Sequence, residues 1–151
     1  MFEELKQMNA ELEELKKIHL EKSKSMFTKI SKMLFDKHPK LESFGWRQYT
    51  PYFNDGDECT FSAHTDEPDI NDINGYDFSR QRITDYNSTK VEGKYQEIDN
   101  PQYNPDLDLA RQDVVSLLNG VDDSVLRQMF GDHVHIKVTS ESTEVEEYDH
   151  D

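Results

Sequence analysis

One stretch of the chain, residues 44–64, constrains the fold more than any other. It holds six of the sixteen aromatic residues, together with the only Trp and the only Cys. Near its middle stands Asp55-Gly56, a dipeptide that two-residue type I′ turns favour because both central residues need positive φ. Aromatic and β-branched residues flank this dipeptide on both sides. The pattern predicts a β-hairpin with Asn54 opposite Asp57 and Gln48 opposite Ala63.

The predicted register separates the side chains of this hairpin onto two faces. The first face is apolar enough to build a core and carries Trp46, Tyr52, Cys59, Phe61 and Ala63. The second face mixes charge with exposed rings and carries Arg47, Tyr49, Pro51, Phe53, Glu58, Thr60, Ser62 and His64. We therefore expect the first face to be buried and the second to serve as a contact surface.

Residues 2–36 predict one long helix, since no Pro or Gly occurs before Pro39. Four apolar residues follow the 3-4-3 spacing of a coiled-coil seam, namely Leu5, Met8, Leu12 and Leu15. A different apolar stripe follows, made of Ile18, Phe27, Ile30 and Leu34. Two interpretations of the seam stay open: a second copy covers it in a homodimer, or the helix lies along its own domain.

The segment after the hairpin is polar over residues 65–105. Residues 65–77 alternate Asp or Asn with Ile and predict a solvated acidic turn with Asn74-Gly75 at its apex. A loose Ca²⁺ or Mg²⁺ site in this turn is the less favoured interpretation, with the ligands Asp69, Asn71, Asp72 and Asp77. Residues 78–105 lack a sustained period and predict a long loop with room for a short strand.

Two helices are predicted next. Asn104-Pro105 is typical of a helix start, and Asn119-Gly120 of its end. The buried face of this helix would contain Leu107, Ala110, Val114, Leu117 and Val121. Asp122 is expected to cap a second helix, which Gly131 would close in the left-handed conformation.

Residues 133–148 predict a C-terminal β-hairpin, because Val134, Ile136 and Val138 alternate with polar residues. A turn at Glu141-Ser142 would set Val138 opposite Val145. The predicted fold class is therefore α+β. It consists of a long N-terminal helix that is partly coiled coil, a central antiparallel hairpin or small sheet, two short helices and a C-terminal hairpin with an acidic tail. Residues 1–40 would form a possible dimerisation segment, and residues 41–151 one small domain.

The formal charge of −15 is concentrated in two places. Residues 54–77 contain eight acids and residues 140–151 six, and neither segment has a Lys or Arg. Such a field repels nucleic acid and membrane surfaces and attracts basic proteins. Direct nucleic-acid or membrane binding is not expected. With one Cys and no 18-residue apolar run, the chain is expected to be a soluble cytoplasmic protein.

An enzymatic function is not predicted. Cys59 lies beside carboxylates, which would raise its pKa rather than activate it. No Gly-rich loop precedes a helix to hold a phosphate group. His133 and His135 are spaced to bind a metal ion with Asp132 or His64, but exposed strand histidines without such a role are commoner. We therefore predict no catalytic residues, no cofactor and no metal.

Three motifs support a family resemblance: YTPYFNDGDECTF at 49–61, FGDHVHIKVT at 130–139 and EVEEYDHD at 144–151. On these motifs, about thirty residues in all, the chain resembles small uncharacterised acidic proteins of tailed double-stranded DNA bacteriophages. The resemblance implies the cytoplasm of an infected bacterium as the setting. It implies no activity and no catalytic residues.

Acidity and phage context together predict a non-catalytic inhibitor of a host defence protein or nuclease. Its acidic surface would occupy a basic groove that normally holds nucleic acid. The expected partner-binding residues are Tyr49, Phe53, Asp55, Asp57, Glu58, Glu144, Glu146, Glu147, Asp149 and Asp151. The alternative is a sponge for nucleotide immune signals, with Arg47, Arg80, Arg82, Tyr49 and Phe53 as phosphate and base contacts.

Overall fold

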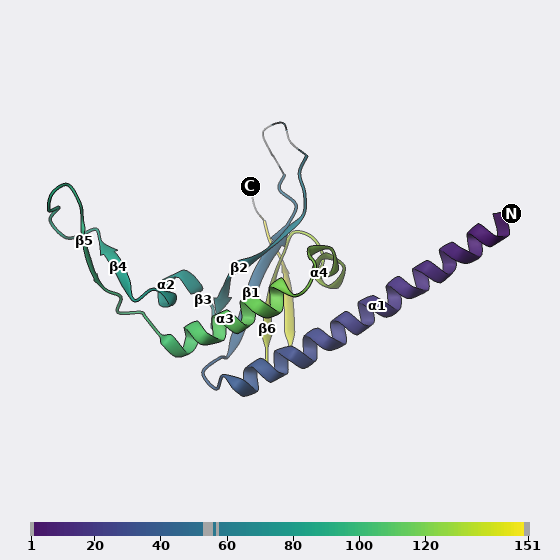
Figure 1. Cartoon of the computed structure of the whole chain (residues 1–151), viewed down its shortest axis with the longest axis horizontal. Helices are drawn as coiled ribbons and strands as arrows, with labels where there is room; N and C mark the ends of the chain where they lie inside the picture. Colours follow the sequence, from purple (N-terminus) through teal and green to yellow (C-terminus); the bar gives the residue numbers. More distant parts are fainter. Residues whose placement is uncertain (1, 53–55, 57, 150–151) are drawn as a thin grey trace.

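The computed structural model describes residues 2–52, 56 and 58–149 and shows an α+β fold, as predicted. In chain order the elements are α1 (Phe2–Lys37), β1 (Ser43–Tyr49), β2 (Ser62–Ile70), β3 (Ile73–Asn74), α2 (Gly75–Ser79), β4 (Arg82–Asp85), β5 (Gln96–Asp99), α3 (Pro105–Asn119), α4 (Asp123–Phe130), β6 (Val134–Thr139) and β7 (Thr143–Glu147). The main sheet is antiparallel with the strand order β3-β2-β1-β6-β7, and β4 and β5 form a separate two-stranded sheet (Figure 1).

The core lies between one face of the main sheet and the helices α1, α3 and α4. Its centre is aromatic: the rings of Phe27, Phe44 and Phe130 surround Trp46 with centroid distances of 5.9, 6.4 and 5.4 Å. Phe27 comes from α1 and Phe130 from the end of α4, so this cluster joins both ends of the chain to β1. The aromatic stretch that the sequence singled out is therefore the centre of the core.

The predicted pairing of Gln48 with Ala63 is confirmed, but the ladder between β1 and β2 stops at Tyr49 and Ser62. The backbone N–H of Thr50 donates instead to the Asp132 carboxylate at 2.8 Å. Tyr52, expected in the core, is 60% exposed. Apart from Gly56, whose φ is +82°, the predicted turn and Phe53 lie outside the described residues.

The prediction of a solvated turn over residues 65–77 is wrong. Strand β2 continues to Ile70, and Thr65, Pro68 and Ile70 are buried. The chain reverses at Asn71-Asp72, which both have positive φ, and Gly75 opens α2 instead of forming a turn apex. The alternation of acidic with apolar residues thus reflects a strand with one face toward the core.

Residues 78–105 also contain more structure than the predicted loop. Strands β4 and β5 pair as a hairpin that projects from the end of α3 opposite to α4 (Figure 1). At its base the amide of Asn100 donates to the carbonyls of Asp77 and Arg80 at 2.7 and 2.8 Å. One buried side chain with long-range partners therefore closes this segment, which no local pattern signalled.

The two predicted helices are confirmed. The Asn104 side chain accepts from the N–H of Leu107. The expected face is buried at Leu107, Ala110, Val114 and Leu117, together with Leu118, whereas Val121 lies past the end of α3 and is only partly buried. Asp122 stands at the N-cap position of α4, although its side chain makes no capping hydrogen bond in the structure. Gly131 ends α4 with φ of +100° and ψ of −179°, so it is not in the predicted left-handed helical conformation.

The C-terminal hairpin is confirmed, but its register differs from the prediction by two residues. Ile136 lies opposite Val145 and Val138 opposite Thr143. The reversal occurs at Ser140-Glu141, because Thr139 bonds across it: its N–H donates to the carbonyl of Ser142, and its hydroxyl accepts from the N–H of Ser142. A hydroxyl that closes the turn has therefore set the register.

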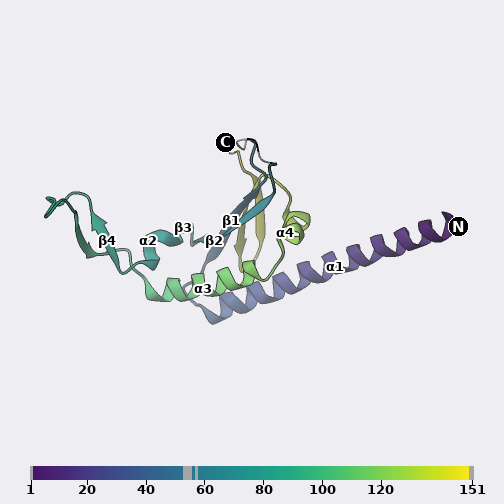
Figure 2. The same cartoon turned by 45° about the horizontal axis from the view of Figure 1, so that its top comes forward.

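Helix α1 extends over the predicted range, but only its second half packs on the domain. Its buried residues are Phe27, Ser31 and Leu34, whereas every residue from 2 to 19 is exposed. Both views show this first half projecting away from the rest of the molecule (Figures 1 and 2). The interpretation in which the seam of α1 lies along its own domain is therefore wrong, and dimerisation stays a prediction.

Candidate protein-binding face of the sheet

The main sheet has a second face, opposite the core, which we call the open face. One row of residues crosses four strands there, with His64 paired to Arg47, Arg47 to His135 and His135 to Glu146. A parallel row contains Asp69, Gly45, Lys137 and Glu144. The open face therefore combines bases and acids in neighbouring positions rather than presenting acids alone.

Gly45 has a specific function in the second row. A Cβ at this position would lie 2.5 Å from the carbonyl oxygen of Ile136 and 3.5 Å from Nε2 of His135. Without it, the imidazole of His135 lies close over the strand and places Nε2 3.4 Å from the Asp69 carboxylate. Lys137 donates to Asp72 at 2.9 Å, and this hydrogen bond raises the pKa of Lys137. Asp69 and Asp72, considered above as metal ligands, are thus paired with His135 and Lys137.

Aromatic rings occupy the end of the open face near the C-terminus. Tyr49 stacks on His64 with 4.5 Å between ring centroids and contacts Tyr148 at 5.6 Å. The Arg47 guanidinium carbon lies 5.4 Å from the centre of the Tyr148 ring. This arrangement is a cation–π contact, so the electron-rich faces of these rings are oriented to receive a cation.

A hollow of about 430 Å³ opens beside these rings. Three carboxylates line it, those of Asp66, Glu67 and Asp69. The remaining lining residues are Trp46, Arg47, Tyr49, Ser62, Ala63, His64, Asn74 and Tyr148. Carboxylates next to aromatic rings favour a guanidinium or ammonium group, through charge-assisted hydrogen bonds and cation–π contact. Arg47 offsets one of the three carboxylates, so the lining keeps a net negative charge that disfavours a phosphate group.

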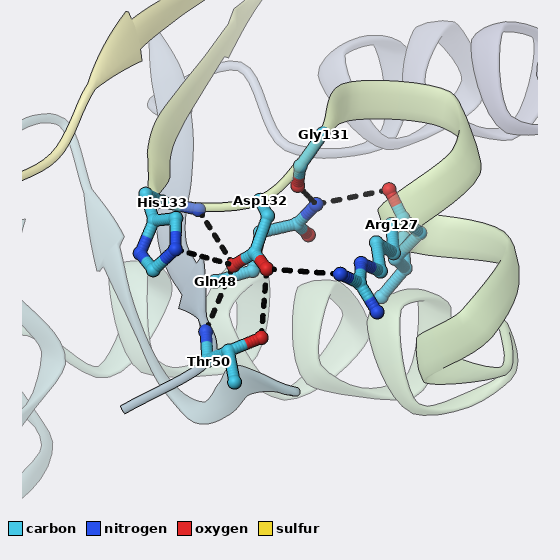
Figure 3. Close-up of polar contacts among 7 residues, drawn as sticks. Gln48, Thr50, Arg127, Gly131, Asp132 and His133 are labelled. Carbon is cyan, nitrogen blue, oxygen red and sulfur yellow. Dashed lines mark hydrogen bonds and ion pairs between the residues drawn. The ribbon is translucent and has the colours of Figure 1, made fainter. Parts of the chain in front are cut away.

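Asp132 anchors the end of the sheet from which the first hairpin extends (Figure 3). Its carboxylate accepts from the N–H and hydroxyl of Thr50 at 2.8 and 2.7 Å, and from Arg127 at 3.2 Å. Burial raises the pKa of this carboxyl, but the hydrogen bonds from Thr50 and from the N–H of His133 outweigh burial, so its pKa is below the ordinary value.

The same anchor holds both arms of the hairpin. Tyr52 stacks on His133 at 4.9 Å, and the guanidinium of Arg127 lies 5.3 Å from the ring centre of Phe61. The Thr50 hydroxyl donates a hydrogen bond to a carboxylate that also accepts from the Thr50 N–H and from Arg127, so this contact ties the hairpin to the end of α4. We therefore interpret this cluster as a structural support for the open face.

The structure gathers some of the predicted partner-binding residues and separates others. Tyr49, Glu144 and Glu146 share the open face, whereas Glu147 pairs with Val134 and points to the other face of β7. Glu58 and Asp149 are exposed outside the strands. Phe53, Asp55, Asp57 and Asp151 lie outside the described part of the chain.

Sequence reasoning missed the most suggestive members of the site. Asp66, Glu67 and Asp69 belong to the end of β2, which the sequence assigned to a loop. A strict alternation of inward and outward residues would have identified these three acids as part of a strand. An irregularity interrupts that alternation, because the register of β2 against β1 shifts between Gly45 and Arg47. This irregularity leaves Asp66 and Glu67 adjacent and both exposed.

The residues proposed for nucleotide binding are not brought together. Arg47 and Tyr49 lie on the open face, whereas Arg82 belongs to β4, where it pairs with Asp99 at 3.0 Å. Figure 2 shows β4 outside the main sheet, on the far side of α2 from β1. Arg47 and Arg82, both named for the nucleotide alternative, thus lie in different sheets, and Phe53 lies outside the described residues, so this alternative stays a prediction.

Comparison with known proteins adds no relative: no family model, no curated protein and no solved structure matches the chain. Within residues 2–52, 56 and 58–149, no helix combines the length and apolar character needed to cross a membrane. Over the same part of the chain, no cluster of three or more His, Cys, Asp or Glu side chains is arranged to hold a metal ion.

Proposed function

We propose that this protein is a non-catalytic interaction protein that binds a basic surface of a host protein through its open face. In the setting implied by the phage-like motifs, the partner is a defence factor or nuclease in the cytoplasm of an infected bacterium. Binding would block the groove in which that partner holds nucleic acid. The protein would thus inhibit its partner by occupying this groove, without catalysing a reaction.

The observation that carries this proposal is the acidic and aromatic hollow beside Tyr49 and Tyr148. A partner arginine entering it would meet up to three carboxylates and the face of a tyrosine ring. Arg47 contacts Tyr148 in this way within the chain, and a partner arginine would form the same kind of contact. A nucleic-acid-binding groove supplies arginines of this kind in number.

The charge distribution supports the same function. Residues 38–151 contain 25 Asp and Glu against nine Lys and Arg. A field of this sign accelerates encounter with a basic protein, and salt weakens the acceleration. Glu144 and Glu146 extend the acidic lining toward the sheet edge at β7.

The first experiment identifies the partner and then tests the hollow. Full-length protein is used to capture host proteins, and the captured protein is titrated against it at several salt concentrations and in competition with duplex DNA. The double variant Asp66→Asn/Glu67→Gln should weaken binding about tenfold and reduce its salt dependence, because two charges of the hollow are lost.

A matched control removes the same charge elsewhere. Glu92→Gln/Glu97→Gln alters two exposed acids of the β4–β5 segment and should leave the affinity within about twofold. Equal losses in both double variants would contradict the hollow as the contact and indicate net charge alone. Captured proteins that duplex DNA fails to displace would contradict the proposed mode of inhibition.

Native mass spectrometry of protein purified from infected cells separates this function from the nucleotide alternative. A host protein that stays bound supports the proposal. A nucleotide that stays bound contradicts it, because the hollow is lined by carboxylates.

A further inference from the structure

The exposed half of α1 carries an apolar seam without a partner in the monomer. Leu5, Met8, Leu12 and Leu15 are 48%, 58%, 48% and 63% exposed. They lie in one heptad register and therefore on one side of the helix. A stripe of four large apolar residues on a charge-rich helix is typical of a surface that another helix covers.

The spacing of this seam is symmetric about the level of residue 10. In an antiparallel pair of helices centred there, Leu5 of one copy lies level with Leu15 of the other, and Met8 with Leu12. These are the mixed layers of an antiparallel coiled coil, and the contact is isologous, so two copies complete it. The seam therefore fits a second copy of itself in reversed direction.

Charge favours the antiparallel direction over the parallel one. Glu3 and Glu4 stand at one end of the free segment, and Lys16 and Lys17 at the other. Reversal sets the acids of each copy level with the lysines of its partner, whereas parallel packing sets like charges together. Parallel packing would also bring the two strongly acidic bodies, residues 38–151, to the same end of the pair.

The structure also defines where the partner helix would end. The next seam positions after Leu15, His19 and Lys22, lie beside Val125 and Gln128 of α4, where the free stretch of helix stops. An apolar hollow of about 510 Å³ opens at this point, with Ile18 in its lining. In the antiparallel register, Phe2 of the second copy comes level with Ile18, at the mouth of this hollow.

We propose that the protein forms an antiparallel homodimer through residues 2–18 of α1, with Phe2 of each copy placed in the hollow between α1 and α4 of the other. The two acidic bodies then lie at opposite ends of the helix pair. Each dimer then carries two open faces, one in each body, so one dimer can engage two partner molecules. The dimer does not depend on the identity of that partner.

Cross-linking tests the direction of the pair. In a Cys59→Ser background, Leu5→Cys and Leu15→Cys proteins of different tag length are mixed and oxidised. In the mixture, the yield of the mixed disulfide should be at least about tenfold higher than the disulfide yield of either variant oxidised alone. The reason is that position 5 of one copy faces position 15 of the other. Ala10→Cys, on the opposite side of the helix, should not cross-link. Self-cross-linking of Leu5→Cys without a mixed species would overturn the antiparallel arrangement.

Sedimentation equilibrium tests the contact itself. Wild-type protein should have twice the 17.8 kDa mass of the chain. Leu12→Asp should weaken dimerisation roughly 100-fold or more, while Ala10→Asp, which places the same charge off the seam, should leave it within about threefold. The melting temperature of the body should be equal in both variants, because Ala10 and Leu12 lie on the exposed stretch of α1 that projects from it. A wild-type protein that is monomeric at high micromolar concentration would overturn the proposal.

Discussion

Strand β1 presents two faces of the main sheet that differ in how they are held together. Phe44, Trp46 and Gln48 point into the core and are almost fully buried, whereas the alternating Arg47 is exposed. Helices α1, α3 and α4 cover the first face, whereas contacts among side chains of the sheet, such as that of Arg47 with Tyr148, organise the second. The same seven residues thus supply both the stability of the fold and its candidate binding surface.

The difference has an energetic consequence. Side chains in the core are close-packed, so the removal of a group lowers the free energy of unfolding. The ion pairs and stacked rings of the open face are solvated, and solvated pairs contribute little to stability. Such contacts can be exchanged for contacts with a partner at small cost, which is why the second face is suited to binding.

The largest expected effect is that of Trp46→Ala. This change opens a cavity between the rings of Phe27 and Phe130 and should lower the free energy of unfolding by about 3–5 kcal/mol. Chemical denaturation followed by far-UV circular dichroism measures it, since the variant lacks the Trp fluorophore. A loss below about 1 kcal/mol would show that the two faces do not differ as described.

A smaller effect is expected at Gln48, the polar member of the core face. Its amide donates to the carbonyls of Leu126 and Gly131 at 2.9 and 2.7 Å, and its oxygen accepts from the indole N–H of Trp46 at 3.0 Å. Gln48→Leu keeps most of the volume but leaves these groups unpaired, and should lower stability by about 1–3 kcal/mol. A more stable Gln48→Leu protein would show that the hydrogen bonds of this side chain are dispensable.

The acid sensitivity of the fold should come from carboxyls at the edges of the sheet and helices, not from the apolar core face. The folded-state pKa of Asp132 is below its ordinary value of 3.8, so its stabilising effect is fully present above that value and declines as the pH falls through the folded pKa. Asp132→Asn should lower stability by about 1–2 kcal/mol at neutral pH.

Unfolding measured from pH 7 to pH 3 checks this behaviour. The difference in stability between wild type and Asp132→Asn should narrow as the pH falls below 3.8, because the unfolded chain then binds a proton that the folded carboxyl, with its lowered pKa, resists. Asp113, whose pKa is lowered by hydrogen bonds from Lys37 and His38, should behave in the same direction. If the stability difference between wild type and Asp132→Asn were constant from pH 7 to pH 3, the loss would come from altered packing or hydrogen-bond geometry and not from the charge of the carboxylate.

The smallest effect is expected on the open face. Arg47→Ala removes the cation–π contact with Tyr148 and should change stability by no more than about 0.5 kcal/mol. Thermal unfolding of Arg47→Ala and Trp46→Ala, measured under the same conditions, compares the two faces directly, since the two residues are neighbours in one strand. A loss comparable to that of Trp46→Ala would remove the distinction between a structural and a functional face.

Several elements could be predicted because their signals are local. The cap of α3 depends on Asn104 and its neighbours within three residues, and the alternation of β6 on six consecutive residues. The pairing of Gln48 with Ala63 followed from the Asp55-Gly56 turn pattern. In each case short-range geometry and burial favour the same structure.

Other features could not be predicted because they depend on residues far away in the chain. The Thr50–Asp132 hydrogen bonds span 82 residues and end the β1–β2 ladder early. The irregularity at Asp66 and Glu67 breaks the alternation by which strands are recognised. Two carboxylates of the hollow, those of Asp66 and Glu67, lie where the alternation breaks, so the residues of the hollow were only partly foreseen.

The sequence by itself determined the α+β class, the long α1 helix, the two helices α3 and α4 and the inward residues of β6, since hydrophobic periodicity and capping act within a few residues. Only the tertiary structure decided which face of the sheet the helices cover, that β2 runs on to Ile70, and that residues 2–19 stand free of the domain. The physical reason is that burial is a property of the assembled layers: a residue pattern offers an apolar face, and the packing of distant elements determines whether that face is covered.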